Sequence, residues 1–158
     1  MLLVGLVWSA PANTAPCAAA MPVAGNLSSS FGIRHGTLHP GVDLRAPIGS
    51  GVNAAASGTV VFAGTWFDYG LMVEIEHADG SRARYAHLAR FEKGLQPGTS
   101  VKPGDRIATL GRTGRTTGPN LHVELRRAGR PVDPWPWLIG ATCKIGTEHL
   151  VEQGHSPS

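Results

Sequence analysis

The stretch from Leu71 to Leu88, LMVEIEHADGSRARYAHL, decides the fold class. Its first half alternates, with Glu74 and Glu76 on one side of an extended chain and Val73 and Ile75 on the other, which is the period of a half-buried strand. The Ala-Asp-Gly that follows is a tight-turn signal, and a second extended run comes after it. The stretch therefore predicts a β-hairpin, in which we expect Glu74 and Glu76 to form a solvated strand face.

The rest of the chain repeats this pattern of short extended runs between turns. With 21 glycines and 12 prolines among 158 residues, turns must be frequent and strands short. Further strands are expected within residues 51–66, 101–111 and 120–132. No long segment has the 3.6-residue period of an amphipathic helix, and a single helical turn is expected at residues 89–93. We therefore predict an all-β fold, a compact antiparallel β-sheet domain.

The length and composition agree with one globular domain. Hydrophobic residues make up 42% of the chain and charged residues 16%, which is typical of a folded protein with a real core. The net charge of +3 fits an acidic polymer as a partner. It is low for a nucleic-acid-binding protein, and no basic surface with interleaved aromatics is evident, so we expect no nucleic-acid partner.

The N-terminus predicts an exported protein. The apolar run at residues 1–8 is too short to span a bilayer, and small residues follow it, with cleavage options at Ala10 or Ala20. A start that is not a signal is the alternative, and no other segment predicts a membrane span. The expected organisation is a signal, targeting or disordered segment, a domain and a polar tail, at residues 1–20, 21–140 and 141–158.

The two cysteines, Cys17 and Cys143, have no C-x-x-C spacing, so they do not indicate a zinc knuckle or a redox motif. In an oxidising compartment they would form a disulfide between the two ends of the domain. Two unrelated thiols are the alternative, because cleavage after Ala20 would remove Cys17.

The motif HPGVD places an imidazole, His39, four residues before a carboxylate, Asp43. Pro40 and Gly41 argue against a helix, and along a straight strand the two side chains would lie roughly 13 Å apart. They can bind one ion only if the chain bends at Pro40 and Gly41. A pair of residues with no metal role is the alternative.

The motif LHVE adds a third candidate ligand, His122. In an extended chain, His122 shares a polar face with Asn120 and Glu124, and the apolar residues between them pack on the other face. With His39 and Asp43 it would complete a set of two histidines and one carboxylate. Such a set, with an open fourth position, is typical of catalytic zinc sites. A solvated polar face on an edge strand is the alternative.

The motif YAHL places His87 just after the predicted hairpin, where we expect it to share a face with Tyr85. Near a metal site, His87 could transfer protons; a structural histidine is the alternative.

The remaining conspicuous residues are assigned structural roles. Residues 111–118, GRTGRTTG, lack the ending of a phosphate-binding loop and are expected to form a mobile wall of a groove. We expect His77 to hydrogen-bond the turn that follows it. Trp135 and Trp137 are expected to pack a C-terminal strand onto the core.

Together these motifs form one ordered set. The order is SSSFGIR, HPGVDLRAPIGSGVNAAASGTVVFAG, YG, YAHL, VKPGDRIATLGRTGRTTGPNLHVEL and PVDPWPWL. The sequence thereby resembles, from about Val23 to Leu138, the lysostaphin/LytM-type zinc endopeptidases, family 23 of the metallopeptidases. The resemblance implies a compact antiparallel β fold, related to barrel-sandwich hybrids, with a central zinc groove. It also implies a substrate, the peptide of peptidoglycan, and we expect a monomer.

The resemblance assigns roles to individual residues. It places Zn²⁺ on His39, Asp43 and His122, and it gives His87 a catalytic role. One position departs from the family pattern, because the strand motif H-L-H here begins with Asn120. In the family the missing histidine is not a ligand but one of two that assist catalysis.

The amide of Asn120 cannot act as a general base, although it can donate a hydrogen bond to an oxyanion. The first hypothesis is therefore a zinc endopeptidase acting on peptidoglycan, with His87 and Asn120 as catalytic residues. The second is a degenerate, non-catalytic zinc-binding domain that serves as an activator, scaffold or wall-peptide binder.

Overall fold

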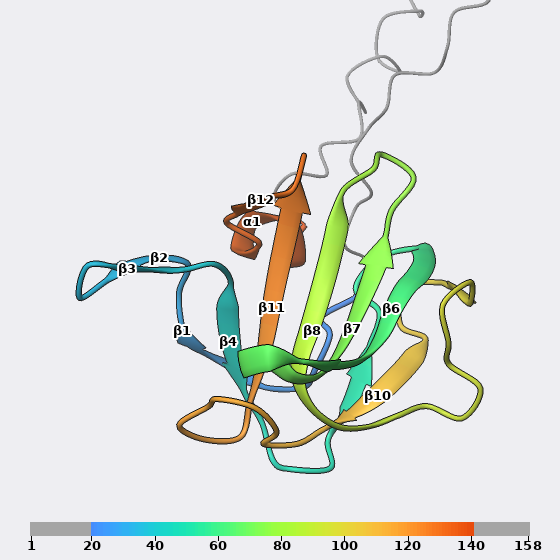
Figure 1. The fold of residues 1–158 in the computed structure, drawn as a ribbon, viewed down its shortest axis with the longest axis horizontal. Helices are drawn as coiled ribbons and strands as arrows, with labels where there is room; N and C mark the ends of the chain where they lie inside the picture. The colour runs from blue at the N-terminus through green and yellow to red at the C-terminus, as the bar shows by residue number, and fades with distance from the viewer. Residues whose placement is uncertain (1–19, 141–158) are drawn as a thin grey trace, which may run out of the picture.

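A computed structural model describes residues 20–140, which fold mainly into strands (Figure 1). The strands are β1 (Asn26–Ser29), β2 (Gly32–Arg34), β3 (Thr37–His39), β4 (Val42–Arg45), β5 (Gly51–Asn53), β6 (Gly58–Trp66), β7 (Gly70–Glu76), β8 (Arg82–Phe91), β9 (Ser100–Val101), β10 (Arg106–Leu110), β11 (Asn120–Arg127) and β12 (Arg130–Val132). The helical elements are the 3₁₀ turn η1 (Phe67–Tyr69) and the helix α1 (Trp135–Leu138). The expected leader segment and the pair Cys17 and Cys143 lie outside the described residues.

The strands pair throughout in the antiparallel sense, which confirms the predicted fold class. The main sheet has ten strands in the order β1-β4-β11-β8-β7-β6-β9, with β10 joined to β5 and β8, and β12 joined to β11. Strands β2 and β3 form a separate hairpin that projects to the left in Figure 1. Within residues 20–140, no helix has the length and apolar character needed to cross a membrane.

The hairpin predicted from Leu71 to Leu88 is present as β7 and β8, joined by a turn in which Gly80 has a φ of 78°. The helical turn expected at residues 89–93 is wrong, because β8 continues to Phe91. There it pairs with β10, Arg90 opposite Thr109, so the neighbouring strand satisfies the backbone hydrogen bonds that a helical turn would have satisfied internally.

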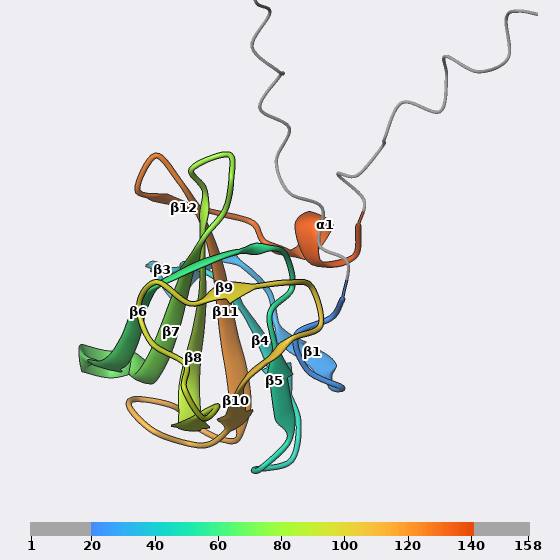
Figure 2. The same ribbon diagram turned by 90° about the vertical axis from the view of Figure 1, so that its right-hand side faces the viewer.

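The core lies between β6 to β8 and the strands β5 and β10, which Figure 2 shows displaced to the right. It joins Val52 and Ile107 to Val60 and Val73, all fully buried. Trp137 is buried in the core and Trp135 packs against it, as expected. The two tryptophans lie in helix α1, however, and not in a C-terminal strand. Proline is tolerated in the first turn of a helix, and Pro136 occupies such a position.

The outer face of β7 and β8 corrects another expectation. Glu74 is only 6% exposed rather than solvated. It forms ion pairs with Arg82 and Arg84 on the neighbouring strand, whose long side chains cover it. Arg84 also lies 3.7 Å from Glu124 on β11. Paired arginines and glutamates therefore cover this face of three adjacent strands.

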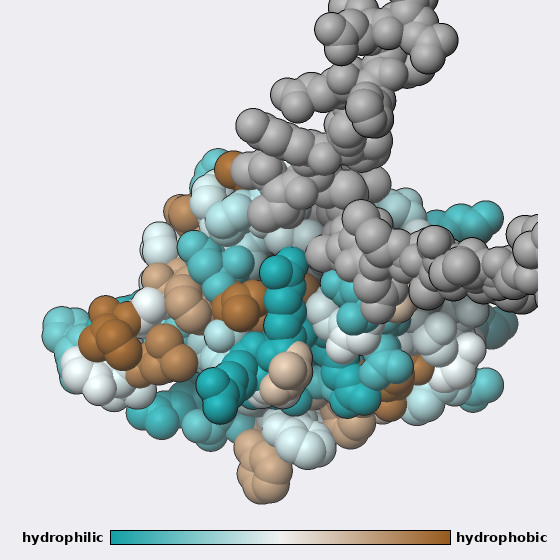
Figure 3. All heavy atoms as spheres, turned by 90° about the horizontal axis from the view of Figure 1, so that it is seen from above, coloured by the Kyte–Doolittle hydropathy of each residue, from teal (hydrophilic) through white to brown (hydrophobic). Residues whose placement is uncertain are grey.

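The projecting hairpin has an apolar outer side and a polar inner end. Ile33 and Leu38 are exposed on it, and in the view from above hydrophobic residues gather at the left edge while hydrophilic ones cross the middle (Figure 3). Arg34 and His39, at the ends of its two strands, line a groove together with residues of the main sheet.

Candidate functional site

The bend expected between His39 and Asp43 is present, because β3 ends at His39 and β4 begins at Val42. A Cβ atom on Gly41 would lie 2.2 Å from the carbonyl oxygen of Val123. Only glycine, which has no Cβ atom, therefore allows the backbone at this bend to pack directly against β11. As a result, His39 Nε2 lies 3.3 Å from Asp43 Oδ1, far closer than on a straight strand.

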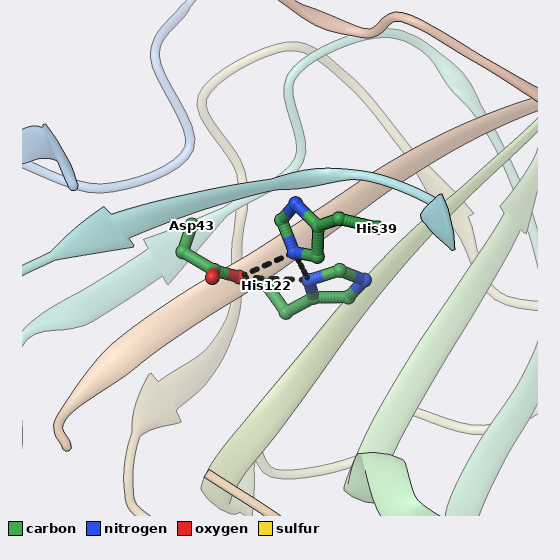
Figure 4. A group of neighbouring side chains, drawn as sticks. All are labelled: His39, Asp43 and His122. Atoms are coloured by element: carbon green, nitrogen blue, oxygen red, sulfur yellow. Dashed lines mark hydrogen bonds and ion pairs between the residues drawn. The ribbon is translucent and has the colours of Figure 1, made fainter. Parts of the chain in front are cut away.

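The pairing of β4 with β11 brings in the third side chain, since His122 lies directly opposite Asp43. His122 Nδ1 lies 2.8 Å from Asp43 Oδ1 and 3.2 Å from His39 Nε2 (Figure 4). One ligand atom from each of the three residues lies within 4.8 Å of the others, so the group could hold a metal ion.

The outward-facing ring nitrogens show how each histidine is oriented. His39 Nδ1 lies 2.8 Å from the carbonyl oxygen of Ser30, to which Arg34 also donates at 3.0 Å. His122 Nε2 lies 3.3 Å from the carboxylate of Glu124. The Arg34 guanidinium also contacts His39 Nδ1, and a carboxylate faces each nitrogen of His122, Asp43 at Nδ1 and Glu124 at Nε2. An ion bound between His39 Nε2 and His122 Nδ1 would select the tautomers with lone pairs on these inward nitrogens and hydrogens on the outward ones.

Two imidazole nitrogens and the Asp43 carboxylate thus converge on one point, an arrangement that could hold a cation. In a tetrahedral site with Zn–N bonds of about 2.0–2.1 Å, ligand atoms are roughly 3.3 Å apart, close to the observed 2.8–3.3 Å. Burial opposes positive charge on His122, but its hydrogen bonds with the Asp43 and Glu124 carboxylates outweigh burial and raise its pKa. The donor set and its surroundings fit a divalent ion such as zinc.

His87 reaches the same groove from β8 through a β-bulge. Leu88 pairs with Leu71 and Tyr85 pairs with Val73, so β8 has one more residue than β7 between these two pairs. His87 lies in this bulge and has a φ of 62°. A bulge re-aims the side chains that follow it. The expectation that His87 and Tyr85 share a face is therefore wrong, because Tyr85 is fully buried in the core.

The loop at residues 111–118 holds His87 in one orientation. His87 Nδ1 donates to the carbonyl oxygen of Thr113 at 2.8 Å, which leaves its Nε2 as a proton acceptor. Burial lowers the pKa of His87 and keeps the ring neutral. The rings of His87 and His122 are 6.0 Å apart. The loop also contributes Arg115, Thr116 and Thr117 to the lining of the groove, as expected for a groove wall.

Asn120, the first residue of β11, lines the groove with the other predicted site residues. The hydroxyl of Ser28 lies 3.1 Å from Asn120 Oδ1 and 3.1 Å from the carbonyl oxygen of Asp43. With Oδ1 facing Ser28, the NH₂ group of Asn120 is free to donate. Sequence reasoning missed Ser28, because nothing in an isolated serine-rich run indicates a partner on a strand 92 residues away.

The polar face of β11 is not displayed as expected. Asn120, His122 and Glu124 are 7%, 6% and 0% exposed. The edge-strand alternative is also wrong, since β11 lies between β4 and β8. Burial opposes ionisation of Glu124, but hydrogen bonds from His122, Tyr69 and Arg126 lower its pKa to about 2.

All five predicted site residues meet in one groove of about 530 Å³, which Tyr69 also lines.

Comparisons with known proteins agree on one family. The model of peptidase family M23 matches residues 37–134. The DD-carboxypeptidase/endopeptidase Mpg of Neisseria meningitidis is 43% identical over 114 residues, covering 68% of this chain and 26% of the relative. The murein hydrolase activator NlpD of Salmonella typhimurium is 35% identical over 136 residues, covering 82% and 34%.

A solved structure described as a zinc-containing peptidase from Vibrio cholerae superposes with a TM-score of 0.68 at 34% identity. The match covers 76% of this chain and 39% of that one. This chain spans about a quarter to a third of the length of the two curated relatives.

Proposed function

Because this chain belongs to peptidase family M23, we propose that it is a zinc-dependent endopeptidase that hydrolyses peptide bonds in the cross-links or stems of peptidoglycan. One observation carries the proposal: two imidazole nitrogens and one carboxylate converge in a groove that His87 also lines. The name of the Neisseria relative describes such an endopeptidase.

His39 Nε2, Asp43 Oδ1 and His122 Nδ1 would hold the zinc. When bound, zinc acts as a Lewis acid that polarises the scissile carbonyl and makes water a stronger acid. The Ser30 carbonyl and the Glu124 carboxylate would accept hydrogen bonds from the outward N–H groups of the two zinc-bound imidazoles.

His87 and Asn120 would perform the proton transfer and the charge stabilisation. His87 Nε2 takes the proton from the attacking water and gives it to the leaving amine, since its Nδ1 is already committed to Thr113. The Asn120 NH₂ donates a hydrogen bond to the oxygen that gains negative charge. Only one of the two groups can move a proton, so we expect slow hydrolysis compared with a site that has two histidines there.

Action on peptidoglycan requires export, and we propose a protein of the periplasm, cell wall or exterior that works as a monomer. One relative in Pseudomonas aeruginosa is named a lipoprotein, which agrees with export. We propose residues 21–140 as the catalytic domain; the matched family model lies within these bounds.

Digestion of purified peptidoglycan tests the proposal. The protein is incubated with peptidoglycan in the presence of Zn²⁺, and new amino and carboxyl termini are identified by mass spectrometry. We expect peptide fragments that disappear on chelation and are absent with His122→Ala. Failure to release any peptide at any zinc concentration would contradict a peptidase.

A second function is favoured by Asn120 and by the relative named a murein hydrolase activator. In this role the domain binds zinc and a wall peptide or protein partner without cleaving peptide bonds. The two functions differ in one measurement: zinc binding accompanied by no turnover supports the second, and zinc-dependent release of peptides supports the first.

A further inference from the structure

Glu124 is a fully buried carboxylate that is surrounded by polar side chains. Its Oε1 accepts a hydrogen bond from the Tyr69 hydroxyl at 2.5 Å and lies 3.3 Å from His122 Nε2. Its Oε2 accepts from Arg126 at 2.7 Å. Arg84 lies 3.7 Å from the same oxygen. A buried charge is tolerated only when its acceptor capacity is filled, and here it is.

We propose that Glu124 is the positioning residue of the metal centre: it fixes the tautomer and the ring orientation of His122, and Tyr69 and Arg126 lock its carboxylate in place. The inference rests on the proposed zinc site but not on peptide cleavage, so it applies equally to a peptidase and to a non-catalytic zinc domain.

The geometry supports this role over a purely structural one. With the proposed zinc on His122 Nδ1, which faces Asp43 and His39, the only hydrogen on the neutral ring is on Nε2, which points at Glu124. A carboxylate behind a ligating imidazole increases the basicity of the ring and holds its plane. The outward nitrogen of His39 contacts the Ser30 carbonyl and the Arg34 guanidinium, so His122 is the histidine whose outward nitrogen faces a carboxylate.

Tyr69 connects this arrangement to the groove. It lies in η1, lines the groove, and its ring centroid is 5.8 Å from that of His122. Its hydroxyl and the His122 ring share Oε1 of Glu124, while Arg126 holds Oε2. With both oxygens occupied, rotation of the carboxylate away from His122 would break at least one further hydrogen bond.

The test measures zinc affinity by competition with a chromogenic chelator. Glu124→Gln keeps the size and an acceptor oxygen but loses the charge; loss of such a partner typically weakens metal binding roughly ten- to a hundredfold. Tyr69→Phe, which leaves the charge intact, should weaken zinc binding by less. The matched control is Glu74→Gln, which removes another buried carboxylate from the same arginine-covered face.

A second measurement separates positioning from folding. In zinc-loaded protein labelled with ¹⁵N, the Nε2–H of His122 should give one sharp, slowly exchanging signal that broadens in Glu124→Gln and is unchanged in Glu74→Gln. If Glu124→Gln does not unfold but binds zinc as tightly as the wild type, the inference is wrong. Equal losses of affinity in both glutamine variants would overturn it too, because that result marks a general effect on stability.

The possible failures are distinguishable. If the wild-type protein binds zinc but cleaves no peptide, the proposed peptidase function is wrong and the proposed role of Glu124 stands. Wild-type protein that binds no zinc removes both. Zinc-dependent cleavage with an unaffected Glu124→Gln variant removes only the positioning role.

Discussion

The metal corner (His39, Asp43 and His122) and the acid–base flank (His87 and Asn120) line the same groove but are held in different ways. The corner is built from paired strands: Asp43 lies opposite His122 in the register of β4 and β11. The flank depends on a bulge for His87 and on one hydroxyl from another strand for Asn120.

This difference indicates which site residues can be replaced without loss of the metal site. In the corner, each inward nitrogen has two site partners and each outward nitrogen has an acceptor, so the sheet register itself specifies the geometry. The flank needs only groups that point into the groove, and an amide can occupy the place of an imidazole without disturbing the ligands. The corner should therefore decide zinc binding and the flank should decide rate.

The largest expected effect is the loss of the corner. His122→Ala removes the ligand that contacts both Asp43 and His39, so bound zinc should fall from one equivalent to none, as measured by elemental analysis after dialysis. The control is His87→Ala, which should keep its zinc. A full equivalent of zinc in His122→Ala would show that the corner is not the metal site.

The next largest effect should come from His87. Removal of a general base typically costs roughly a hundred- to ten-thousand-fold in rate, so peptide release by His87→Ala should fall by that order while the zinc dissociation constant stays the same. Parallel assays of release and of chelator competition check this. If both quantities fell together, the division between corner and flank would not hold.

A smaller loss is expected at Asn120. Removal of one oxyanion donor typically lowers kcat by about a hundred- to a thousandfold, and Asn120→Ala should do so with zinc affinity unchanged. An unaltered kcat would mean that the amide does not face the developing charge.

The reverse substitution, at the same position, tests whether the natural chain is catalytic. Asn120→His should raise peptide release modestly if His87 already moves the proton. A jump from no turnover to clear turnover would favour the non-catalytic function for the natural chain. The measurement is the rate of new amino termini in the two proteins at equal zinc occupancy.

Local patterns predicted the corner better than the flank. The bend at Pro40 and Gly41 and the alternation around His122 are short-range features, so spacing and strand period indicated the candidate ligands. The family resemblance joined them into one site, because the pairing of β4 with β11 has no local signal. The bulge at His87 has no such signal, since no glycine or proline precedes it and its φ of 62° is set by pairing with two strands.

The burial of charged residues was also beyond local patterns. Glu74 and Glu124 occupy the polar positions of their strands, and alternation alone predicts exposure there. Arginines on the neighbouring strand β8 reach both of them, Arg82 and Arg84 to Glu74 and Arg84 to Glu124, and this depends on the order of the strands in the sheet. Helix α1 was missed for a similar reason: four residues carry too little periodicity to indicate a helix.

The smallest expected effect concerns His77, a buried histidine outside both halves of the site. Its backbone carbonyl accepts from Gly80 in the turn that follows, as expected. Its Nδ1 donates to the carbonyl oxygen of Ser57 at 2.7 Å, and its Nε2 has no hydrogen-bond partner. Burial lowers the pKa of His77 below 6.5 in the folded protein. The unfolded chain therefore binds more protons as the pH falls below about 6.5.

The stability contributed by neutral His77 is thus complete above the unfolded pKa and is lost as the pH falls through the folded pKa. Chemical denaturation of zinc-free protein from pH 7.5 to 5 should show stability decreasing, with a shallower decrease in His77→Gln. Burial also lowers the pKa of His87, so His87 adds to the decrease in both proteins, and the difference between the two profiles reports His77. Identical stability profiles for wild type and His77→Gln would mean that the pKa of His77 is the same in the folded and the unfolded protein and that the decrease arises elsewhere.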